Sequence, residues 1–272
     1  MKPKTLTLQT LAECSIMVAL ATVLSVFKLF EMPYGGSITF ASLLPIVIVA
    51  YRHGTKVGIG SALVASVLQM LLGLKNFSYF TSVESFIALA LFDYLIAFTV
   101  FGLAGILRSK LGSQTTELAL GTLIACVLRY ICHTISGATV WAGLSIPTEA
   151  ALIYSISYNA TYMIPDTIIL ALTAVYVCSA LELSGRIPKR RRSEKLDTVS
   201  AYLALGAGLS LLIGLIIDTV LVFGKLQNPE TGDFDITGIT SVDPVAITVT
   251  TLVALAVSLV LIVIIKKRSK AN

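Results

Sequence analysis

Charged side chains are scarce in this sequence. Asp, Glu, Lys and Arg make up 13% of its 272 residues, whereas hydrophobic residues make up 56% and the mean hydropathy is +0.89. That balance excludes the soluble globular class. The net charge of +5 does not indicate nucleic-acid binding, because Lys and Arg stand in short clusters between apolar runs, not in a stripe interleaved with aromatics. We therefore expect an integral membrane protein in a lipid bilayer.

Motifs of cofactor, nucleotide and hydrolytic chemistry are missing as well. The four cysteines lie in apolar segments without CxxC spacing, which argues against a disulfide framework or a zinc site. The sequence has no GxxxxGK loop, no HExxH motif, no GxSxG elbow and no paired acidic cluster for magnesium and diphosphate. We expect no cofactor, no ATP hydrolysis by this chain and no enzymatic activity. The first apolar stretch lacks a small-residue cleavage site, so it is expected to be retained as a helix.

What the sequence does contain is a series of long apolar runs. A membrane-spanning helix needs about 20 mainly apolar residues, and the sequence predicts eight candidates, at residues 10–30, 37–51, 57–73, 85–107, 117–140, 150–182, 199–224 and 243–265. The second and third are short, and the sixth is long enough to tilt or to kink at Pro165. Because the runs do not alternate with period two, they favour an all-α membrane bundle over a barrel.

Basic residues are divided unequally between the two sides of these spans. Of the 20 Lys and Arg, sixteen fall on the side that carries both termini, three fall on the other side, and Arg129 lies within a span. The positive-inside rule then places both termini in the cytoplasm. The largest cluster, from Arg186 to Lys195, either binds anionic lipid head groups or simply fixes the topology. It predicts three parts: a six-helix membrane domain at 1–185, a basic cytoplasmic linker at 186–198, and a two-helix membrane extension at 199–272.

Five polar or ionisable residues interrupt the apolar runs: Asp93, Arg129, His133, Asn159 and Asp166. A charge inside the membrane costs about 3 kcal/mol on insertion scales and more on isolated-helix estimates. A chain that keeps several such residues usually arranges them around a polar site. We therefore expect the functional site within the membrane and not in the loops.

Helical spacing brings these residues toward one region. Arg129, His133, Gly137 and Trp141 recur at intervals of four, which places them along one slowly turning face of the fifth predicted helix. That face is too polar to contact lipid. We expect it to face the outer half of the bundle.

The neighbouring predicted helices add further polar groups at the same depth. Tyr154 and Asn159 fall in the outer half of the sixth helix, and Asp93 and Tyr94 lie about two turns below the outer surface in the fourth. An acid, an amide, an imidazole and several aromatic rings then share one volume, which suits a flat cationic guest.

The same residues also fit a purely structural interpretation. Asp93 or Asp166 would pair with Arg129, His133 would be a satisfied core imidazole, and Asn159 would hold two helices together. The sequence alone leaves both interpretations open for these five residues.

At these residues the chain resembles the thiamine-specific substrate-binding (S) subunit of energy-coupling-factor vitamin transporters. The resemblance runs from about Leu8 to about Leu183. It is carried by a combination of segments: Tyr34-Gly-Gly-Ser-Ile-Thr, Leu44-Pro45, Tyr51-Arg-His-Gly54, Leu72-Gly-Leu-Lys-Asn-Phe-Ser-Tyr79, Phe92-Asp-Tyr94, Gly102-Leu-Ala-Gly105, Arg129-Tyr-Ile-Cys-His133, Gly137, Trp141 and Tyr154-Ser-Ile-Ser-Tyr-Asn159.

The resemblance implies a six-helix bundle that holds thiamine in a deep pocket beneath the loop between helices 1 and 2. It implies that Asp93 balances the thiazolium charge, with Tyr94 beside it. His133, Tyr154 and Asn159 would bind the aminopyrimidine end. The remaining implied binding residues are Trp141, which would stack on the ligand, Gly137, which allows close approach, and Arg129, which lies near the pocket.

Two departures from the resembling family stand out. Members can carry a tryptophan in the helix 1 to 2 loop, where this chain has Gly35 and Gly36, and a glutamate where it has Asp93. The two C-terminal helices have no counterpart in the six-helix pattern.

The resemblance also implies partners. Uphill uptake would need a membrane coupling subunit and two ATPase subunits, because this chain carries no nucleotide-binding loop. Ser15 and Ala19 form a small-xxx-small pair that lets another helix approach closely. The resemblance implies that this face docks on the coupling subunit, although the same spacing also serves ordinary bundle packing.

Alternative functions remain at this stage. The scaffold could hold another vitamin or vitamin precursor, or act as a carrier coupled to protons through Asp93, His133 or Asp166. An intramembrane enzyme would use His133 with one of these carboxylates, but the catalytic motifs named above are missing. A purely structural membrane protein would not explain why acid, imidazole and aromatic groups converge at one depth.

Overall fold

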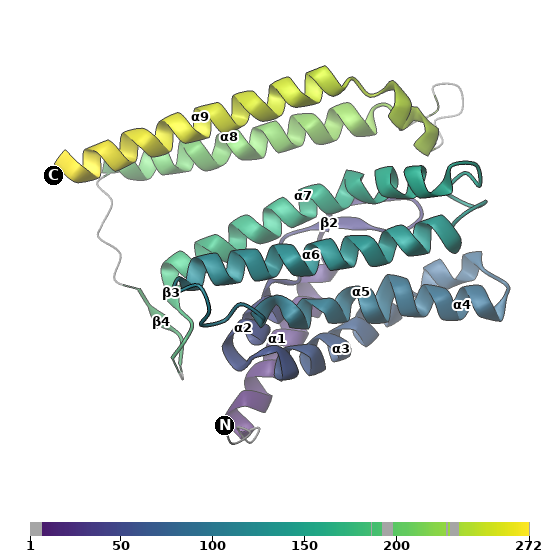
Figure 1. Cartoon of the computed structure of the whole chain (residues 1–272), viewed down its shortest axis with the longest axis horizontal. Helices are drawn as coiled ribbons and strands as arrows, with labels where there is room; N and C mark the ends of the chain where they lie inside the picture. Colours follow the sequence, from purple (N-terminus) through teal and green to yellow (C-terminus); the bar gives the residue numbers. More distant parts are fainter. Residues whose placement is uncertain (1–6, 186, 192–197, 227, 229–233, 272) are drawn as a thin grey trace. The chain divides into compact units, whose positions relative to one another are not determined.

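The computed structural model describes residues 7–271 except 186, 192–197, 227 and 229–233. Contacts divide the chain into two compact units, residues 1–191 and 192–272. Each unit is helical (Figure 1). The predicted linker, 186–198, lies partly outside the described residues, so its boundaries stay a prediction.

Unit 1 carries the segments predicted to form the first six helices. Its elements are α1 (Leu8–Val26), β1 (Lys28–Glu31), β2 (Ser37–Thr39), α2 (Leu44–His53), α3 (Thr55–Leu72), a 3₁₀ helix (Leu74–Tyr79), α4 (Val83–Leu89), a π-helical turn (Ala90–Leu95), α5 (Ile96–Thr99), a second 3₁₀ helix (Val100–Gly105), α6 (Gln114–Thr139), α7 (Ala151–Ala180), β3 (Leu181–Glu182) and β4 (Lys189–Arg190). Figure 1 shows α6 and α7 side by side, with β2 alongside α7.

Unit 2 is a helical hairpin made of α8 (Thr198–Phe223), a 3₁₀ helix (Ile236–Ser241) and α9 (Pro244–Ala271). The two helices are in close contact at Gly214 of α8 and Ala254 of α9. A Cβ added to Gly214 would lie only 2.6 Å from the Cβ of Ala254. Within this interface the Asp218 carboxylate accepts hydrogen bonds from the hydroxyls of Thr250 and Thr251. The remaining faces of both helices are mostly exposed and apolar, as lipid contact requires.

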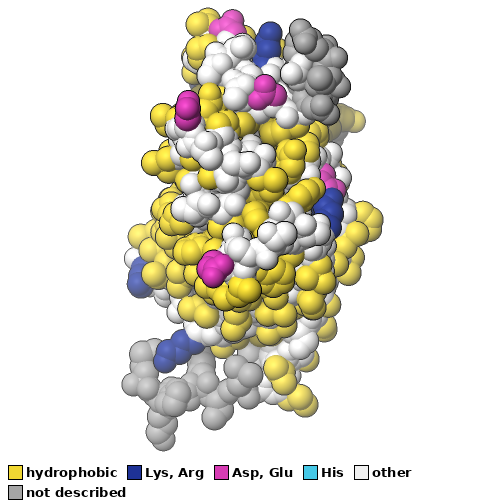
Figure 2. All heavy atoms as spheres, turned by 90° about the vertical axis from the view of Figure 1, so that its right-hand side faces the viewer, with side chains coloured by type: hydrophobic (Ala, Val, Ile, Leu, Met, Phe, Trp, Pro, Cys, Tyr) yellow, Lys and Arg dark blue, Asp and Glu magenta, His cyan; other side chains and the backbone are white. Residues whose placement is uncertain are grey.

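Seven helices in the described part of the chain are long and apolar enough to cross a membrane. They are Leu8–Val26, Thr55–Leu72, Val83–Gly105, Gln114–Thr139, Ala151–Ala180, Tyr202–Phe223 and Pro244–Arg268. Hydrophobic side chains are spread widely over the face shown in Figure 2, with only scattered charged side chains. An all-α membrane protein with two additional C-terminal helices is therefore confirmed.

The prediction of a membrane-spanning helix is wrong for the second candidate, at 37–51, which was expected to be short. Its first residues belong to β2, which pairs antiparallel with β1 through a turn in which Gly35 and Gly36 have φ of +95° and +92°. The remaining helix, α2, has ten residues and is therefore only about 15 Å long, half of a bilayer's hydrocarbon core. The same hairpin takes residues 28–30 from the first predicted span, so α1 ends at Val26.

The short α2 is the centre of the core in unit 1. Its residues from Pro45 to Arg52 are all buried, because α1, α3, α6 and the 3₁₀ helix at Val100–Gly105 pack around it. Gly105 lets the backbones approach, since an added Cβ there would meet the Ala50 carbonyl oxygen. Near the first turn of α6, the buried Glu117 carboxylate accepts hydrogen bonds from the Tyr51 hydroxyl, at 2.8 Å, and from three backbone N–H groups.

Candidate functional site

A cavity of about 150 Å³ lies in unit 1, toward the end of α6 that is opposite Glu117. Its walls come from the β1–β2 hairpin, the segment at 72–76, the π-helical turn, α6, the loop after α6 and α7. It is thus built from segments far apart in the sequence, which is typical of a ligand pocket between helices.

Asp93 lies within the π-helical turn Ala90–Leu95, in the middle of a membrane-length helix. Such a turn widens the helix by one residue and is frequent at functional sites. The carboxylate is held on both sides, because Oδ1 lies 3.0 Å from His133 Nδ1 and Oδ2 accepts a hydrogen bond of 2.8 Å from Trp141 Nε1. The side chains of Asp93 and His133 are each 12% exposed. An acid, an imidazole and an indole therefore form one connected group in a nearly dry environment.

Arg129 pairs with the other intramembrane carboxylate of this region. Its Nη1 donates to Asp166 Oδ2 at 3.1 Å, and its Nε donates to His133 Nε2 at 3.4 Å. The guanidinium carbon lies 4.9 Å from the centre of the Phe98 ring, which is cation–π distance. Asp166 also accepts two hydrogen bonds from Thr39, one from the backbone N–H and one from the hydroxyl. The charge of Arg129 is thus committed to Asp166.

Asn159 connects α7 to α6 beside the cavity. Its Nδ2 donates to the Ser155 carbonyl oxygen at 2.9 Å and to the His133 carbonyl oxygen at 3.2 Å, and its Oδ1 accepts from the Tyr162 hydroxyl at 2.7 Å. Gly137 is needed at this crossing, because an added Cβ would meet Ser155 Oγ and would lie 3.5 Å from Asn159 Nδ2. Asn159 therefore serves the helix packing as well as the cavity wall.

Aromatic rings surround Trp141 near the cavity. The ring centres of Tyr79 and Phe80 lie 5.9 and 4.9 Å from that of Trp141. Deeper in the cavity wall, Tyr94 stacks with Phe98 at 6.5 Å between ring centres. These faces offer a flat or cationic ligand several places to stack.

Charged groups line the cavity at the β1–β2 hairpin. Glu31 Oε1 lies 2.8 Å from Lys28 Nζ and 3.0 Å from Lys75 Nζ. The Lys28 ammonium holds the pKa of the Glu31 carboxyl below its usual value, with Lys75 contributing and partial burial opposing. The contact with Lys75 fastens the hairpin to the 3₁₀ helix at Leu74–Tyr79.

Comparison with known proteins identifies the family. Residues 11–183 match the family model described as thiamine transporter protein. The chain is also 32% identical over 190 residues to the thiamine transporter ThiT of Bacillus subtilis (strain 168), which covers 66% of this chain and 93% of that protein. This chain belongs to the thiamine transporter family. A solved structure of ThiT from Listeria monocytogenes has a TM-score of 0.51 at 21% identity, covers 62% of this chain and 92% of that chain, and shows the shared fold.

The family match ends at residue 183, before α8 and α9 begin. The resemblance in the sequence, from about Leu8 to about Leu183, covers nearly the same residues and is confirmed as membership of the thiamine transporter family. All residues that line the cavity lie within the matched part.

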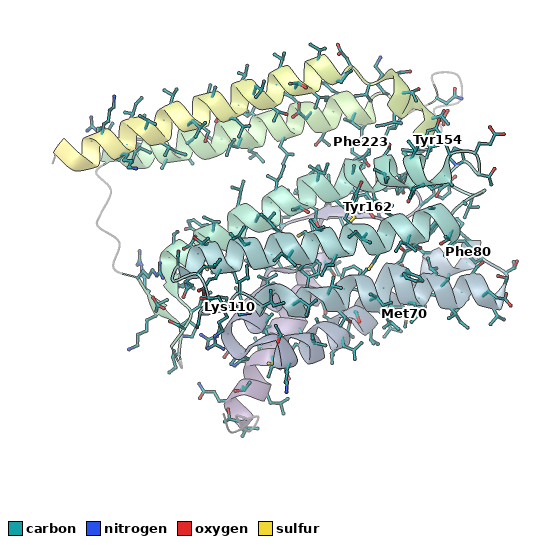
Figure 3. All side chains as sticks on the ribbon, viewed as in Figure 1. Met70, Phe80, Lys110, Tyr154, Tyr162 and Phe223 are labelled. Carbon is teal, nitrogen blue, oxygen red and sulfur yellow. The ribbon has the colours of Figure 1, made fainter. Side chains whose placement is uncertain are left out.

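Seven of the eight predicted binding residues line the cavity of this family member. They are Asp93, Tyr94, Arg129, His133, Gly137, Trp141 and Asn159. Tyr154 is not among the described residues that line it. At 100° per residue, Tyr154 points about 140° away from Asn159 around α7, whereas Tyr158 and Tyr162 point to within about 100°. Figure 3 shows Tyr154 near the start of α7 and Tyr162 further along the helix.

Other lining residues were not predicted as binding residues, among them Lys28, Glu31, Asn76, Phe98, Tyr158 and Tyr162. The four-residue step from Tyr158 to Tyr162 matches one helical turn and could have indicated both. Asn76, which donates to the Tyr94 hydroxyl at 2.9 Å, lies within one of the segments that carry the family resemblance. Lys28 gave no signal because it falls within the first predicted span, 10–30, and Glu31 lies directly after that span with no motif to mark it.

Proposed function

We propose that this chain takes up thiamine across the cytoplasmic membrane as the substrate-binding subunit of an energy-coupling-factor transporter, and that thiamine binds in the cavity at Asp93. The proposal is supported by membership of the thiamine transporter family together with the chemistry of the cavity. Thiamine is a cation made of two flat rings joined by a methylene group, a permanently charged thiazolium and a hydrogen-bonding aminopyrimidine. The cavity offers a carboxylate and stacking faces in the same space.

The observation that carries the proposal is the environment of Asp93. Its hydrogen-bonding partners among the described residues are His133 and Trp141, whereas Asp166 is paired with the guanidinium of Arg129. A mostly buried carboxylate that is not paired with a guanidinium or an ammonium group is suited to balance the charge of a cationic ligand. We therefore assign Asp93 to the thiazolium, Trp141 and Tyr94 to its flanks, and His133 and Asn159 to the aminopyrimidine.

The indole of Trp141 gives a direct test, because it is the sole tryptophan in the sequence and lines the cavity. Purified full-length protein in detergent is titrated with thiamine while tryptophan fluorescence is followed. We expect saturable quenching with thiamine and none with biotin or nicotinic acid as matched vitamin controls. An unchanged spectrum together with no heat of binding in calorimetry would refute thiamine as the ligand.

We further propose a location in the cytoplasmic membrane with both termini in the cytoplasm. The excess of Lys and Arg on the terminal side supports this orientation. Cysteine-accessibility labelling in intact cells tests it: a cysteine introduced at Ser113, before α6, should be protected from a membrane-impermeant reagent, and one at Thr148, before α7, should react. The reverse pattern would refute the orientation.

Docking on a coupling module is proposed for one face of α1. Cys14 and Val18 are buried in unit 1, whereas Ser15 and Ala19 are exposed about 100° further around the helix. This exposed small-residue pair would let a helix of the membrane coupling subunit pack closely, with two ATPase subunits supplying the energy. An Ala19→Leu variant should bind thiamine as wild type does but lose uptake in cells. Leu20→Phe, an added bulk at an exposed position about 100° around the same helix from Ala19, is the matched control.

The His133 and Asp93 pair also favours a second candidate, a carrier coupled directly to protons. The two functions differ in energy source. Uptake through a coupling module stops when cellular ATP is depleted, whereas a proton-coupled carrier continues until the proton gradient is dissipated.

A further inference from the structure

Asp166 is a buried carboxylate held by three hydrogen-bond donors. The residue is 5% exposed, and it accepts hydrogen bonds from the Thr39 backbone N–H at 2.9 Å, the Thr39 hydroxyl at 3.0 Å and Arg129 Nη1 at 3.1 Å. It does not line the cavity. Thr39 ends β2, so this carboxylate ties the β1–β2 hairpin to α6 and α7 at a single point.

The donors then determine where the proton lies on His133. A guanidinium has only N–H donors, so Arg129 Nε must donate, and His133 Nε2 must accept with its lone pair. The proton of this imidazole is therefore on Nδ1, from which it donates to Asp93 Oδ1 at 3.0 Å. The chain of contacts runs from Asp166 through Arg129 and His133 to the carboxylate proposed to balance thiamine.

Asp166 matters because the long side chain of Arg129 could otherwise take several orientations. A guanidinium with one carboxylate partner can rotate, but Asp166 is itself held by two hydrogen bonds from Thr39, and the Phe98 ring lies 4.9 Å from the guanidinium carbon. These contacts fix the direction of the Nε–H. Partners behind a ligating histidine fix its tautomer and ring orientation in the same way at metal sites.

We propose that Asp166 is a positioning residue for ligand binding: by holding Arg129 in place, it sets His133 in the tautomer with the proton on Nδ1, and so orients the Asp93 carboxylate in the cavity. The functional part of this inference rests on the proposed binding of thiamine. The tautomer itself is a property of the ligand-free protein.

Other ionisable groups surround this chain of contacts. Tyr162 from α7 lies at the His133 ring, with 6.5 Å between ring centres, and Tyr94 adjoins Asp93 in the π-helical turn. Lys28, Glu31 and Lys75 line the same cavity from the hairpin and the following 3₁₀ helix. Only Arg129 and Asp93 are hydrogen-bonded to the His133 ring nitrogens among the contacts of the described residues.

The tautomer can be measured directly, because the sequence has only two histidines, His53 and His133. Solid-state ¹⁵N NMR of full-length protein labelled at histidine distinguishes a protonated Nδ1 from a protonated Nε2. In the His53→Gln variant, the remaining histidine signals all come from His133. We expect the Nδ1-protonated form of His133 in the ligand-free wild type. Protonation on Nε2 would overturn the proposal whatever the ligand is.

Variants then test the role of Asp166. Asp166→Asn places an amide toward Arg129, so we expect a mixture of His133 tautomers and thiamine binding weakened about tenfold, in the range for loss of a charged hydrogen bond. Arg129→Lys keeps a positive charge near Asp166 but has no Nε donor, and it should lose the tautomer preference to the same extent.

A matched control and a milder variant complete the test. Asp218→Asn changes a carboxylate that is also held by threonine hydroxyls, but in unit 2, and should leave both tautomer and affinity unchanged. If Asp166→Asn does not fold, Thr39→Val removes one of the three donors and should shift both measurements in the same direction. An unaltered tautomer in every folded variant would overturn the positioning role. Failure of the wild type to bind thiamine would instead overturn the proposed function.

Discussion

Replacing Asp93 by asparagine removes the carboxylate charge while nearly preserving the shape of the side chain. Two unit charges about 4 Å apart interact by about 4 kcal/mol at the effective dielectric constant of 20 that suits protein sites. The side chain of Asp93 is 12% exposed, so water screens part of this energy. The amide also turns its N–H₂ toward either His133 or Trp141 and so loses one hydrogen bond. We expect thiamine binding to weaken by about 2 to 4 kcal/mol, or roughly 30- to 900-fold.

Calorimetry is the suitable assay for this variant. Trp141 donates to Asp93, so the substitution alters the baseline fluorescence independently of any ligand. The measurement is made on full-length protein at fixed pH and ionic strength, with Asp218→Asn as the control carboxylate. That control should bind thiamine as the wild type does.

A neutral analogue separates charge from shape. Thiamine in which the thiazolium is replaced by a thiophene ring has nearly the same outline but no permanent positive charge. If Asp93 acts through its charge, the asparagine variant should lose much less affinity for this analogue than for thiamine. Equal losses for the two ligands would show that the substitution acts through the structure of the cavity, and an unchanged affinity for thiamine would refute the role of Asp93 altogether.

Three further outcomes follow from contacts in unit 1. Trp141→Phe removes the indole donor, so thiamine should bind about tenfold more weakly, as measured by calorimetry. Gly36→Ala should lower the thermal unfolding midpoint, because φ is +92° and the added Cβ would lie 2.7 Å from the ring of Tyr162; Gly60→Ala, with nothing within 4 Å, is the control. Glu31→Gln should destabilise the protein by less than about 1 kcal/mol at pH 7, since its ion pairs are half-exposed. Because the pKa of Glu31 is lowered in the folded state, this difference should be fully present above the usual value of 4.5 and be lost as the pH falls through the lower folded-state value. A difference that grows toward low pH would contradict the ion-pair assignment.

The sequence predicted the site best where a residue type is energetically costly in its position. Polar residues inside membrane spans are expensive, so Asp93, His133 and Asn159 could be expected at one depth from their positions within the predicted spans. Seven of the eight predicted spans needed only length and hydropathy, which are local properties of the chain.

It was less informative where tertiary contacts decide the local structure. The π-helical turn that carries Asp93 has the sequence Ala-Leu-Phe-Asp-Tyr-Leu, without a proline or glycine to mark it. The β1–β2 hairpin lies between two apolar segments, and hydropathy merges its strands with the neighbouring helices. The burial of α2 explains why ten residues suffice there: other helices surround it, so it does not need to match the membrane thickness.

The assignment of charges shows most clearly what the sequence left open. In the sequence, Asp93 and Asp166 both lie in predicted membrane spans, and either carboxylate could have been the partner of Arg129. The structure pairs Arg129 with Asp166. These two charges cancel, while Asp93 is held by an imidazole and an indole. If His133 carries its one proton on Nδ1, as proposed above, the group formed by Asp93, His133 and Trp141 contains a carboxylate with no cationic side chain bonded to it among the described contacts. A neutral ligand would leave that charge buried at a cost, whereas a cation of matching shape removes it, and selectivity for cationic over neutral vitamins follows from this difference.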